Sequence, residues 1–355
     1  MGRKKLEKAV GDDKLTQYST SAVGDSRIEF YSTTPVGDGR LAHYSTIALR
    51  DFMGVEESEI CLILSDNNMR EIGMAFYEAS LPLCSESFYF EMKPRTVGGE
   101  EPPEQVARIM RDVDVVIAPT SKSLTHTDAR RIASDLNVRI GTMPGITIDT
   151  MARCFSIAPE DIIELTNKVK NLIFDASEIH IETEAGTEIS LPIKGRKIIP
   201  STGVLTKLGE SGNLPSGEVY VAPIEGKSNG TIVFDASFAQ IGMLTSPITI
   251  DIRNGYAEKI SGKTEARTLS RLLNNAGDDA RQIAEFGIGT NPKAIVCGNI
   301  LEDEKAIGTI HIAFGNNIYM GGTINVPIHL DGIILSPTVY ADEVMIMDKG
   351  RLLIP

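Results

Sequence analysis

The chain has 355 residues, of which 35 are basic and 48 acidic, so its formal net charge is −13. No stretch approaches the roughly 18–20 apolar residues that span a bilayer, and the first residues lack the apolar segment of a secretory signal. An acidic chain without a basic tract is poorly suited to bind nucleic-acid phosphates. We therefore expect a globular protein of about two domains that binds neither membranes nor nucleic acid.

The four cysteines are scattered along the chain and form no CxxC pair. This spacing argues against a disulfide framework and against a thiolate zinc site. It is typical of a protein kept in a reducing compartment, so we expect a cytoplasmic location.

The first 46 residues form a tandem repeat with a period of 13 residues. Each of the three units carries VGD and, eight positions later, YST. A unit of this length buries little apolar surface and is shorter than the roughly 20–50 residues of solenoid repeats. We interpret residues 1–46 as a flexible or loosely docked arm, with oligomerisation or docking as its alternative role.

Residues 47–160 alternate between short apolar runs and segments whose apolar residues have helical spacing. This rhythm predicts an α/β domain with a small parallel sheet and helices on both faces. No GxGxxG or GxxxxGK[ST] motif occurs in this region, which weakens a nucleotide-binding interpretation. The expected strands cover 61–66, 87–94, 113–120 and 138–145, and the expected helices 68–80, 102–112 and 126–136.

His126 lies where the last of these helices is expected to begin, with Thr125 as the expected N-cap. A capping or surface role and a contact with substrate are both compatible with this position. A connector helix is expected over 157–176, because Pro159 and two acidic residues mark its first turn.

Residues 161–355 consist mainly of β-branched runs separated by Gly, Asn and Pro, which predicts a β-rich α+β domain with antiparallel strands. One helix is expected over 264–289, broken near Gly277, and Glu285 would follow it. The expected strands cover 179–183, 188–193, 219–223, 231–237, 248–255, 309–315, 326–332 and 343–353.

Candidate metal ligands gather in this second domain. His329 and Asp331 are two residues apart in an apolar strand, so both side chains point to one face, and imidazole and carboxylate are common metal ligands. His311 lies in another apolar strand, where a core role and a ligand role remain alternatives.

Three glutamates add to this group: Glu218, Glu285 and Glu304. Each glutamate either lies in a solvated turn or is buried, and a buried carboxylate needs an oppositely charged side chain or a metal ion beside it. The six side chains offer two imidazoles and four carboxylates, a set rich enough for two divalent ions, so this domain is predicted to bind metal.

At these motifs the chain resembles the aminopeptidase T family, the leucyl aminopeptidases of the M29 type, together with short relatives that include 2,5-dihydroxypyridine dioxygenase. The resemblance covers about residues 50–355. The motifs are SLTHTDARR, MPG, GNLPSGEV, AEFGIGTNP, DEK followed by GTIHIAFG, and IHLD.

The resemblance implies a dinuclear site held by all six side chains, with Glu285 bridging the two ions, and it implies a homodimer. Tyr319 is the nearest match to a tyrosine that the family places shortly after the first histidine.

Three functions follow from this set. The first is a hydrolase, an aminopeptidase that removes N-terminal residues from peptides with two ions of Zn, Mn or Co, in which Glu285 and Tyr319 are catalytic. The alternative is a mononuclear Fe(II) ring-cleaving dioxygenase, a type of iron site that uses two histidines and one carboxylate, which His311, His329 and Asp331 could supply. The resemblance implies a histidine near Glu285 in the dioxygenases, which favours the hydrolase. The third is a non-catalytic binding protein.

Overall fold

The structure is a computed structural model and describes residues 39–354. Most of the predicted repeat arm lies outside these residues. Its last positions form helix α1 (Gly39–Ile47), which continues into the π-helical turn η1 (Ala48–Phe52). Leu41 is buried in an apolar cluster with residues of the first strands. No helix among residues 39–354 is long and apolar enough to cross a membrane.

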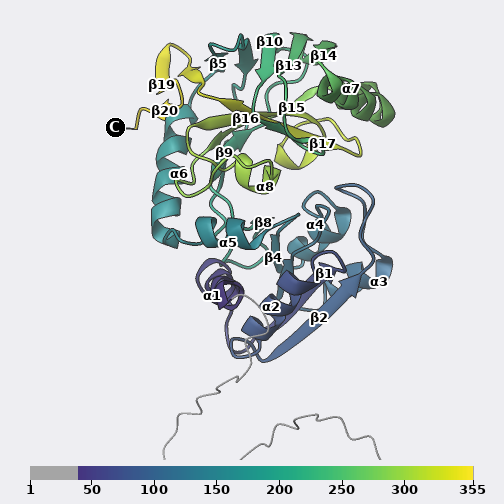
Figure 1. The fold of residues 1–355 in the computed structure, drawn as a ribbon. Coiled ribbons are helices and arrows are strands. Elements are labelled where there is room, and N and C mark those ends of the chain that lie inside the picture. The colour runs from purple at the N-terminus through teal and green to yellow at the C-terminus, as the bar shows by residue number, and fades with distance from the viewer. Residues whose placement is uncertain (1–38, 355) are drawn as a thin grey trace, which may run out of the picture. The chain divides into compact units, whose positions relative to one another are not determined.

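A parallel sheet of five strands, in the order β2-β1-β3-β4-β8, is built largely from the N-terminal part of the described chain (Figure 1). The inner strands β1 and β3 are buried on both faces, because alternate residues of each enter two separate apolar clusters. The predicted α/β architecture with a small parallel sheet is confirmed. The elements are β1 (Ile60–Asp66), α2 (Arg70–Ser80), β2 (Glu86–Met92), α3 (Glu104–Ile109), β3 (Val115–Ala118), α4 (Asp128–Asp135), β4 (Arg139–Thr142), α5 (Ile148–Cys154) and β8 (Ser211–Asn213).

Three local features of this region differ from the prediction. Strand β8 comes from the stretch predicted to belong to the second domain, yet it pairs in parallel with β4. Helix α5 was not predicted, because its seven residues are too few for a clear apolar period. The N-cap of α4 is Thr127, whose hydroxyl accepts a hydrogen bond from the Arg130 amide, rather than Thr125.

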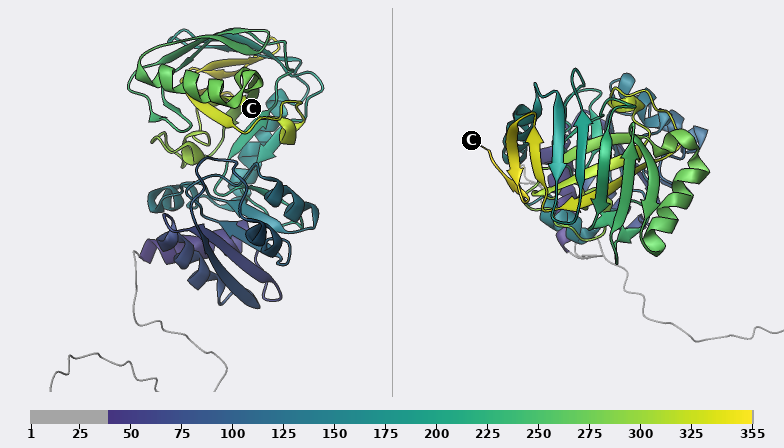
Figure 2. Two further views of the ribbon diagram at one scale, coloured as in Figure 1. Left: turned by 90° about the vertical axis from the view of Figure 1, so that its right-hand side faces the viewer. Right: turned by 90° about the horizontal axis from the view of Figure 1, so that it is seen from above.

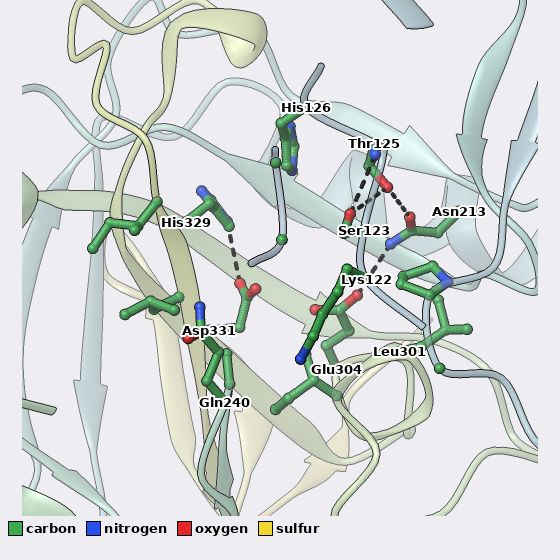
Figure 3. Close-up of a pocket in the computed structure, with 18 of the residues that line it drawn as sticks. Lys122, Ser123, Thr125, His126, Asn213, Gln240, Leu301, Glu304, His329 and Asp331 are labelled. Atoms are coloured by element: carbon green, nitrogen blue, oxygen red, sulfur yellow. Dashed lines mark hydrogen bonds and ion pairs between the residues drawn. The ribbon is translucent and has the colours of Figure 1, made fainter. Parts of the chain in front are cut away.

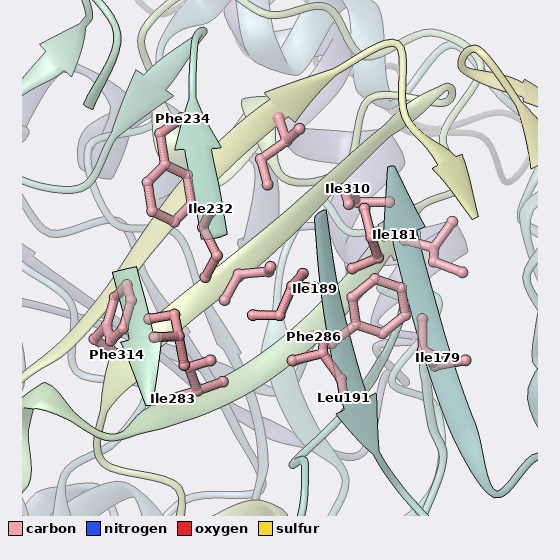
Figure 4. Packing of buried hydrophobic residues seen from close by; sticks show 14 of the residues in the cluster. Ile179, Ile181, Ile189, Leu191, Ile232, Phe234, Ile283, Phe286, Ile310 and Phe314 are labelled. Atoms are coloured by element: carbon pink, nitrogen blue, oxygen red, sulfur yellow. The ribbon is translucent and has the colours of Figure 1, made fainter. Parts of the chain in front are cut away.

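Two antiparallel sheets stack face to face in the C-terminal part, where a single apolar cluster fills the space between them (Figures 2 and 4). The predicted β-rich α+β region is confirmed. The seven-stranded sheet, in the order β12-β11-β17-β16-β15-β9-β7, consists of β7 (Ile199–Ser201), β9 (Glu218–Val221), β11 (Ser237–Phe238), β12 (Gly242–Met243), β15 (Ile283–Gly289), β16 (Thr309–Gly315) and β17 (His329–Leu335).

The eight-stranded sheet has the order β14-β13-β10-β6-β5-β18-β19-β20. Its strands are β5 (Glu178–Glu182), β6 (Glu188–Pro192), β10 (Asn229–Phe234), β13 (Ile248–Arg253), β14 (Tyr256–Ser261), β18 (Thr338–Ala341), β19 (Val344–Asp348) and β20 (Arg351–Leu352). The remaining helical elements are α6 (Pro159–Ile173), α7 (Thr264–Ala276), η2 (Asp278–Arg281), α8 (Ile300–Asp303) and η3 (Ile318–Met320).

Helix α6 begins at Pro159, as predicted, and its buried residues enter the apolar clusters of both regions. It therefore ties the parallel sheet to the sandwich. The division into two domains at residues 160 and 161 stays a prediction.

The helix predicted over 264–289 is wrong in its second half. Helix α7 ends at Ala276, and Gly277 takes a φ of 102°, which breaks the helix where the glycine was expected to do so. Residues 283–289 form the buried strand β15 instead, so Glu285 lies in a strand rather than after a helix. Tertiary burial on both faces decided the conformation of this segment, and the sequence pattern did not reveal that burial.

A buried ion pair joins α5 to α8. The Arg153 guanidinium donates to both carboxylate oxygens of Glu302, at 2.6 and 2.8 Å, and the Thr150 hydroxyl donates to the same carboxylate at 2.7 Å. The Glu302 side chain is fully buried. Burial opposes its ionisation, but the hydrogen bonds from Arg153 and Thr150 outweigh burial and hold its pKa below the ordinary value.

Arg153→Ala should lower the free energy of unfolding by about 3 kcal/mol at pH 7, because it leaves a buried carboxylate unpaired. Because the folded-state pKa of Glu302 is depressed, the difference in free energy of unfolding between the variant and the unmodified protein should shrink as the pH falls below about 4. Urea denaturation at pH 7 and at a pH below about 4 measures this difference. Arg131→Ala is the control, because Arg131 pairs with exposed carboxylates on the surface of α4 and should change little. Equal effects of the two variants would contradict the prediction.

Candidate metal centre

The candidate site lies on the outer face of the seven-stranded sheet, the face opposite the apolar core. Glu285 of β15, Ala313 of β16 and Asp331 of β17 stand at one register position of three adjacent strands. An irregularity in β15 between Ile283 and Glu285 shifts the alternation, so that Ile283 and Phe286 both enter the core while Glu285 faces outward.

Small residues on this face leave room for the larger side chains. Ala313 separates Glu285 from Asp331 in the register, and Gly287 stands beside His311. A Cβ added at Gly287 would lie 2.0 Å from the His311 Nε2. The strand therefore needs glycine here for His311 to occupy its position.

Glu285, His329 and Asp331 form one group that could hold a metal ion. The His329 Nε2 lies 3.1 Å from a Glu285 carboxylate oxygen and 3.3 Å from an Asp331 oxygen. The His329 Nδ1 donates to the backbone carbonyl of Asn316 at 2.7 Å. Nε2 then faces two anionic oxygens, an arrangement that is stable with a proton on Nε2 or with a cation bound between the three groups. This donor set fits a divalent metal ion.

Glu218, Glu285 and His311 form a second group of potential ligands, fully within the protein interior. The His311 Nε2 lies 3.2 Å from Glu285 and 3.5 Å from Glu218. Beside this group the Lys305 ammonium lies 2.8 Å from a Glu218 oxygen and also pairs with Glu304. Sequence reasoning missed Lys305, although it stands in the DEK motif, because a lysine next to a glutamate along the chain is usually a solvated charge.

The electrostatics of the group differ from residue to residue. Burial opposes ionisation of Glu285, yet hydrogen bonds with His311 and His329 hold its pKa below the ordinary value. Burial likewise opposes ionisation of Asp331, and the charge of His329 lowers the pKa of Asp331. Burial raises the pKa of Glu304 to about 8, with Lys305 opposing the rise. Glu285 and Asp331 are thus the carboxylates that stay ionised most readily.

A cavity of about 1040 Å³ opens over His329 and Asp331 and is lined by residues of both the parallel sheet region and the sandwich (Figure 3). One wall consists of aromatic rings. The His126 ring lies 5.1 Å from the His329 ring and stacks on Tyr319 at 6.0 Å, and the Arg130 guanidinium lies 5.8 Å from the Tyr319 ring.

His126 therefore faces the cavity and does not cap α4. Burial, followed by the charge of His329, lowers the pKa of His126 to about 3, so its imidazole is neutral at pH 7. Asn213 of β8 lines the same cavity, where it accepts a hydrogen bond from the Thr125 hydroxyl at 3.0 Å and donates one to Glu304 at 3.3 Å (Figure 3).

The structure brings all six predicted ligand candidates together: Glu218, Glu285, Glu304, His311, His329 and Asp331. Glu304 differs from the other five, because it pairs with Lys305 and Asn213 and belongs to neither ligand group. Tyr319 lies in η3 on the cavity wall. The ligand and catalytic roles of these residues stay predictions.

Residues 55–354 match the family model described as 2,5-dihydroxypyridine 5,6-dioxygenase. A curated 2,5-dihydroxypyridine 5,6-dioxygenase of Pseudomonas putida KT2440 is 24% identical over 204 residues, which are 52% of this chain and 57% of that protein. The chain thus matches a little over half the length of this curated relative.

Two solved structures share the fold. The structure of 2,5-dihydroxypyridine dioxygenase from Pseudomonas putida KT2440 has a TM-score of 0.77 and 19% identity, over 90% of this chain and 99% of that one. Wild-type AmpT from Thermus thermophilus has a TM-score of 0.65 and 16% identity, over 89% and 99%. The resemblance to aminopeptidase T therefore holds for the fold alone.

These comparisons correct the predicted enzyme class. Hydrolase, aminopeptidase and metalloprotease are wrong, because the family model and the curated relative are both dioxygenases, which are oxidoreductases. The prediction rested on the number of carboxylates and on Glu285 in place of the histidine that the resemblance implied for the dioxygenases, and neither feature decides the enzyme class. Since the family model covers 300 consecutive residues, the chain belongs to the family of the 2,5-dihydroxypyridine 5,6-dioxygenases.

Proposed function

We propose that this protein is an Fe(II)-dependent dioxygenase that opens the ring of a dihydroxylated nitrogen heteroaromatic compound such as 2,5-dihydroxypyridine. The observation that carries the proposal is the group Glu285, His329 and Asp331, which combines one imidazole with two carboxylates at the floor of a large cavity. The family assignment names the reaction class.

This ligand set departs from the common arrangement for such iron sites, which uses two histidines and one carboxylate. His311, His329 and Asp331 together would match that arrangement in number. The geometry favours Glu285 over His311, because Glu285 and not His311 shares one group with His329 and Asp331. Fe(II), when bound by this group, would supply the one-electron chemistry that lets O₂ react with an aromatic ring.

The surrounding side chains suit a flat, hydroxylated ring. His126 and Tyr319 present stacked aromatic faces to the cavity, and such faces pack against planar ligands. The neutral His126 imidazole has a free lone pair with which it can accept a hydrogen bond from a substrate hydroxyl group.

The overall reaction consumes one O₂ and one dihydroxypyridine. The bond between ring carbons 5 and 6 breaks, and each of these carbons receives one oxygen atom. Carbon 5, which already carries a hydroxyl oxygen, becomes a carboxyl group, and carbon 6 becomes a formyl group on nitrogen. Both atoms of O₂ are thereby reduced, and no other electron donor is consumed.

Oxygen uptake by the Fe(II)-loaded protein tests this proposal. With 2,5-dihydroxypyridine we expect one O₂ consumed per substrate lost, with parallel loss of the ring absorbance. The metal-free protein should show neither. Absence of oxygen uptake by iron-loaded protein with 2,5-dihydroxypyridine and with other dihydroxylated pyridines would contradict the proposal.

A further inference from the structure

We propose that Lys305 is a built-in cation that fills the second group of metal-type ligands, so that the centre holds one divalent ion per chain instead of two. The inference concerns the centre of the proposed function and rests on it for the presence of the bound ion. It assigns to Glu218 and Glu304 the role of binding an ammonium group.

The first argument is the position of the ammonium group. Lys305 is fully buried, and its Nζ lies 2.8 Å from a Glu218 oxygen while it also pairs with Glu304. A lysine is almost never fully buried unless it is paired, so these two carboxylates are what holds it inside. An ion bound by Glu218 would lie next to this positive charge and would be repelled by it.

The second argument is the hydrogen bonding of the two histidines. The His329 Nδ1 donates to the Asn316 carbonyl, which leaves Nε2 free for a metal, and metal-binding histidines usually have such a partner. The His311 Nδ1 is buried and has no hydrogen-bond partner among residues 39–354. If the His311 Nε2 bound a metal, the hydrogen would move to Nδ1, where it would find no acceptor.

His311 is therefore arranged as a hydrogen-bond donor. Its Nε2 faces Glu285 at 3.2 Å and Glu218 at 3.5 Å, so it orients Glu285 toward the other ligands. Glu285 is common to both groups. One of its oxygens faces His311 and the other faces His329, so the second oxygen is the one that could bind the ion.

Metal counting on the whole protein tests the inference. Chelator-treated protein is titrated with Mn²⁺, bound ions per chain are measured by equilibrium dialysis, and electron paramagnetic resonance reports whether ions are coupled. The unmodified protein should saturate at one ion with an uncoupled six-line spectrum. Lys305→Met should take up a second ion, and because two such ions lie roughly 3.5–4 Å apart, their coupling should weaken that spectrum.

Two controls separate charge from general damage. Lys305→Arg keeps the cation and should bind one ion. Lys168→Met removes an exposed lysine that pairs with Glu164 of the same helix, and this variant should also bind one ion. Two ions in the unmodified protein, or a folded Lys305→Met variant that stays at one, would overturn the inference.

Glu218→Gln keeps the inference testable if Lys305→Met does not fold. Because Glu218 is assigned to the lysine and not to the ion, this variant should still bind one Mn²⁺, with an affinity within about threefold of the unmodified protein. Loss of the ion would overturn the inference.

In the unmodified protein, one bound ion without oxygen uptake would contradict the proposed function alone, whereas two bound ions with oxygen uptake would contradict only the inference.

Discussion

Asp331→Ala should remove the metal ion and abolish oxygen uptake. Asp331 supplies a carboxylate to the group with Glu285 and His329, and its own pKa is lowered against the effect of burial, so it is ionised at neutral pH. Loss of an outer partner of a metal ligand typically costs roughly 10–100-fold in metal affinity. Loss of a direct ligand should cost more than that.

Equilibrium dialysis with Mn²⁺ and the oxygen electrode measure the two effects. Glu182→Ala is the control, because it removes an exposed carboxylate that pairs with His180 at the surface of β5. The unmodified protein should also gain thermal stability when metal is added, and Asp331→Ala should not, because only binding to the folded state stabilises it. Metal binding by Asp331→Ala at normal affinity would exclude this residue as a ligand.

His126→Phe should raise KM of the proposed reaction by roughly threefold to tenfold while kcat changes little. Phenylalanine keeps an aromatic face toward Tyr319 but has no lone pair to accept a hydrogen bond from a substrate hydroxyl group, and such a hydrogen bond contributes about 0.5–1.5 kcal/mol. His126→Ala loses both the face and the lone pair, so it should raise KM further.

The pH dependence sharpens this prediction. Because burial lowers the pKa of His126 to about 3, its lone pair is free from pH 5 to 9. The ratio of the KM values of His126→Phe and the unmodified protein, measured by steady-state oxygen uptake, should therefore be constant over this range. His180→Ala is the control, because it removes a half-buried histidine that lies beside Tyr340 in the other sheet, and its KM should be normal. A His126→Phe variant with normal KM would show that another group accepts the hydrogen bond.

The alternation of apolar runs made most strands predictable. His329 and Asp331 could be placed on one face from the two-residue period of a strand alone, and the structure confirms that they lie together. Strand β15 could not be predicted, because its irregular alternation and burial on both faces depend on its neighbours β9 and β16. The pairing of β8 with β4 joins residues about 70 positions apart, which no local pattern encodes.

The chemistry of the site was predictable in its residue types but not in its pairings. The sequence contains six donors that the fold does bring together, and a count of donors suggested two ions. Only the structure shows that a lysine faces two of the glutamates and that His126 faces the ligands from another part of the chain. Donor counts alone cannot distinguish a metal ion from an ammonium group as the bound cation.

Isotope labelling of the product tests the central claim most directly. The Fe(II)-loaded protein is supplied with 2,5-dihydroxypyridine under ¹⁸O₂, and the ring-opened product is analysed by mass spectrometry. We expect two ¹⁸O atoms per product molecule, one in the new carboxyl group and one in the formyl group. A product that carries no ¹⁸O, or no product at all, would contradict the assignment of this protein as a ring-cleaving dioxygenase.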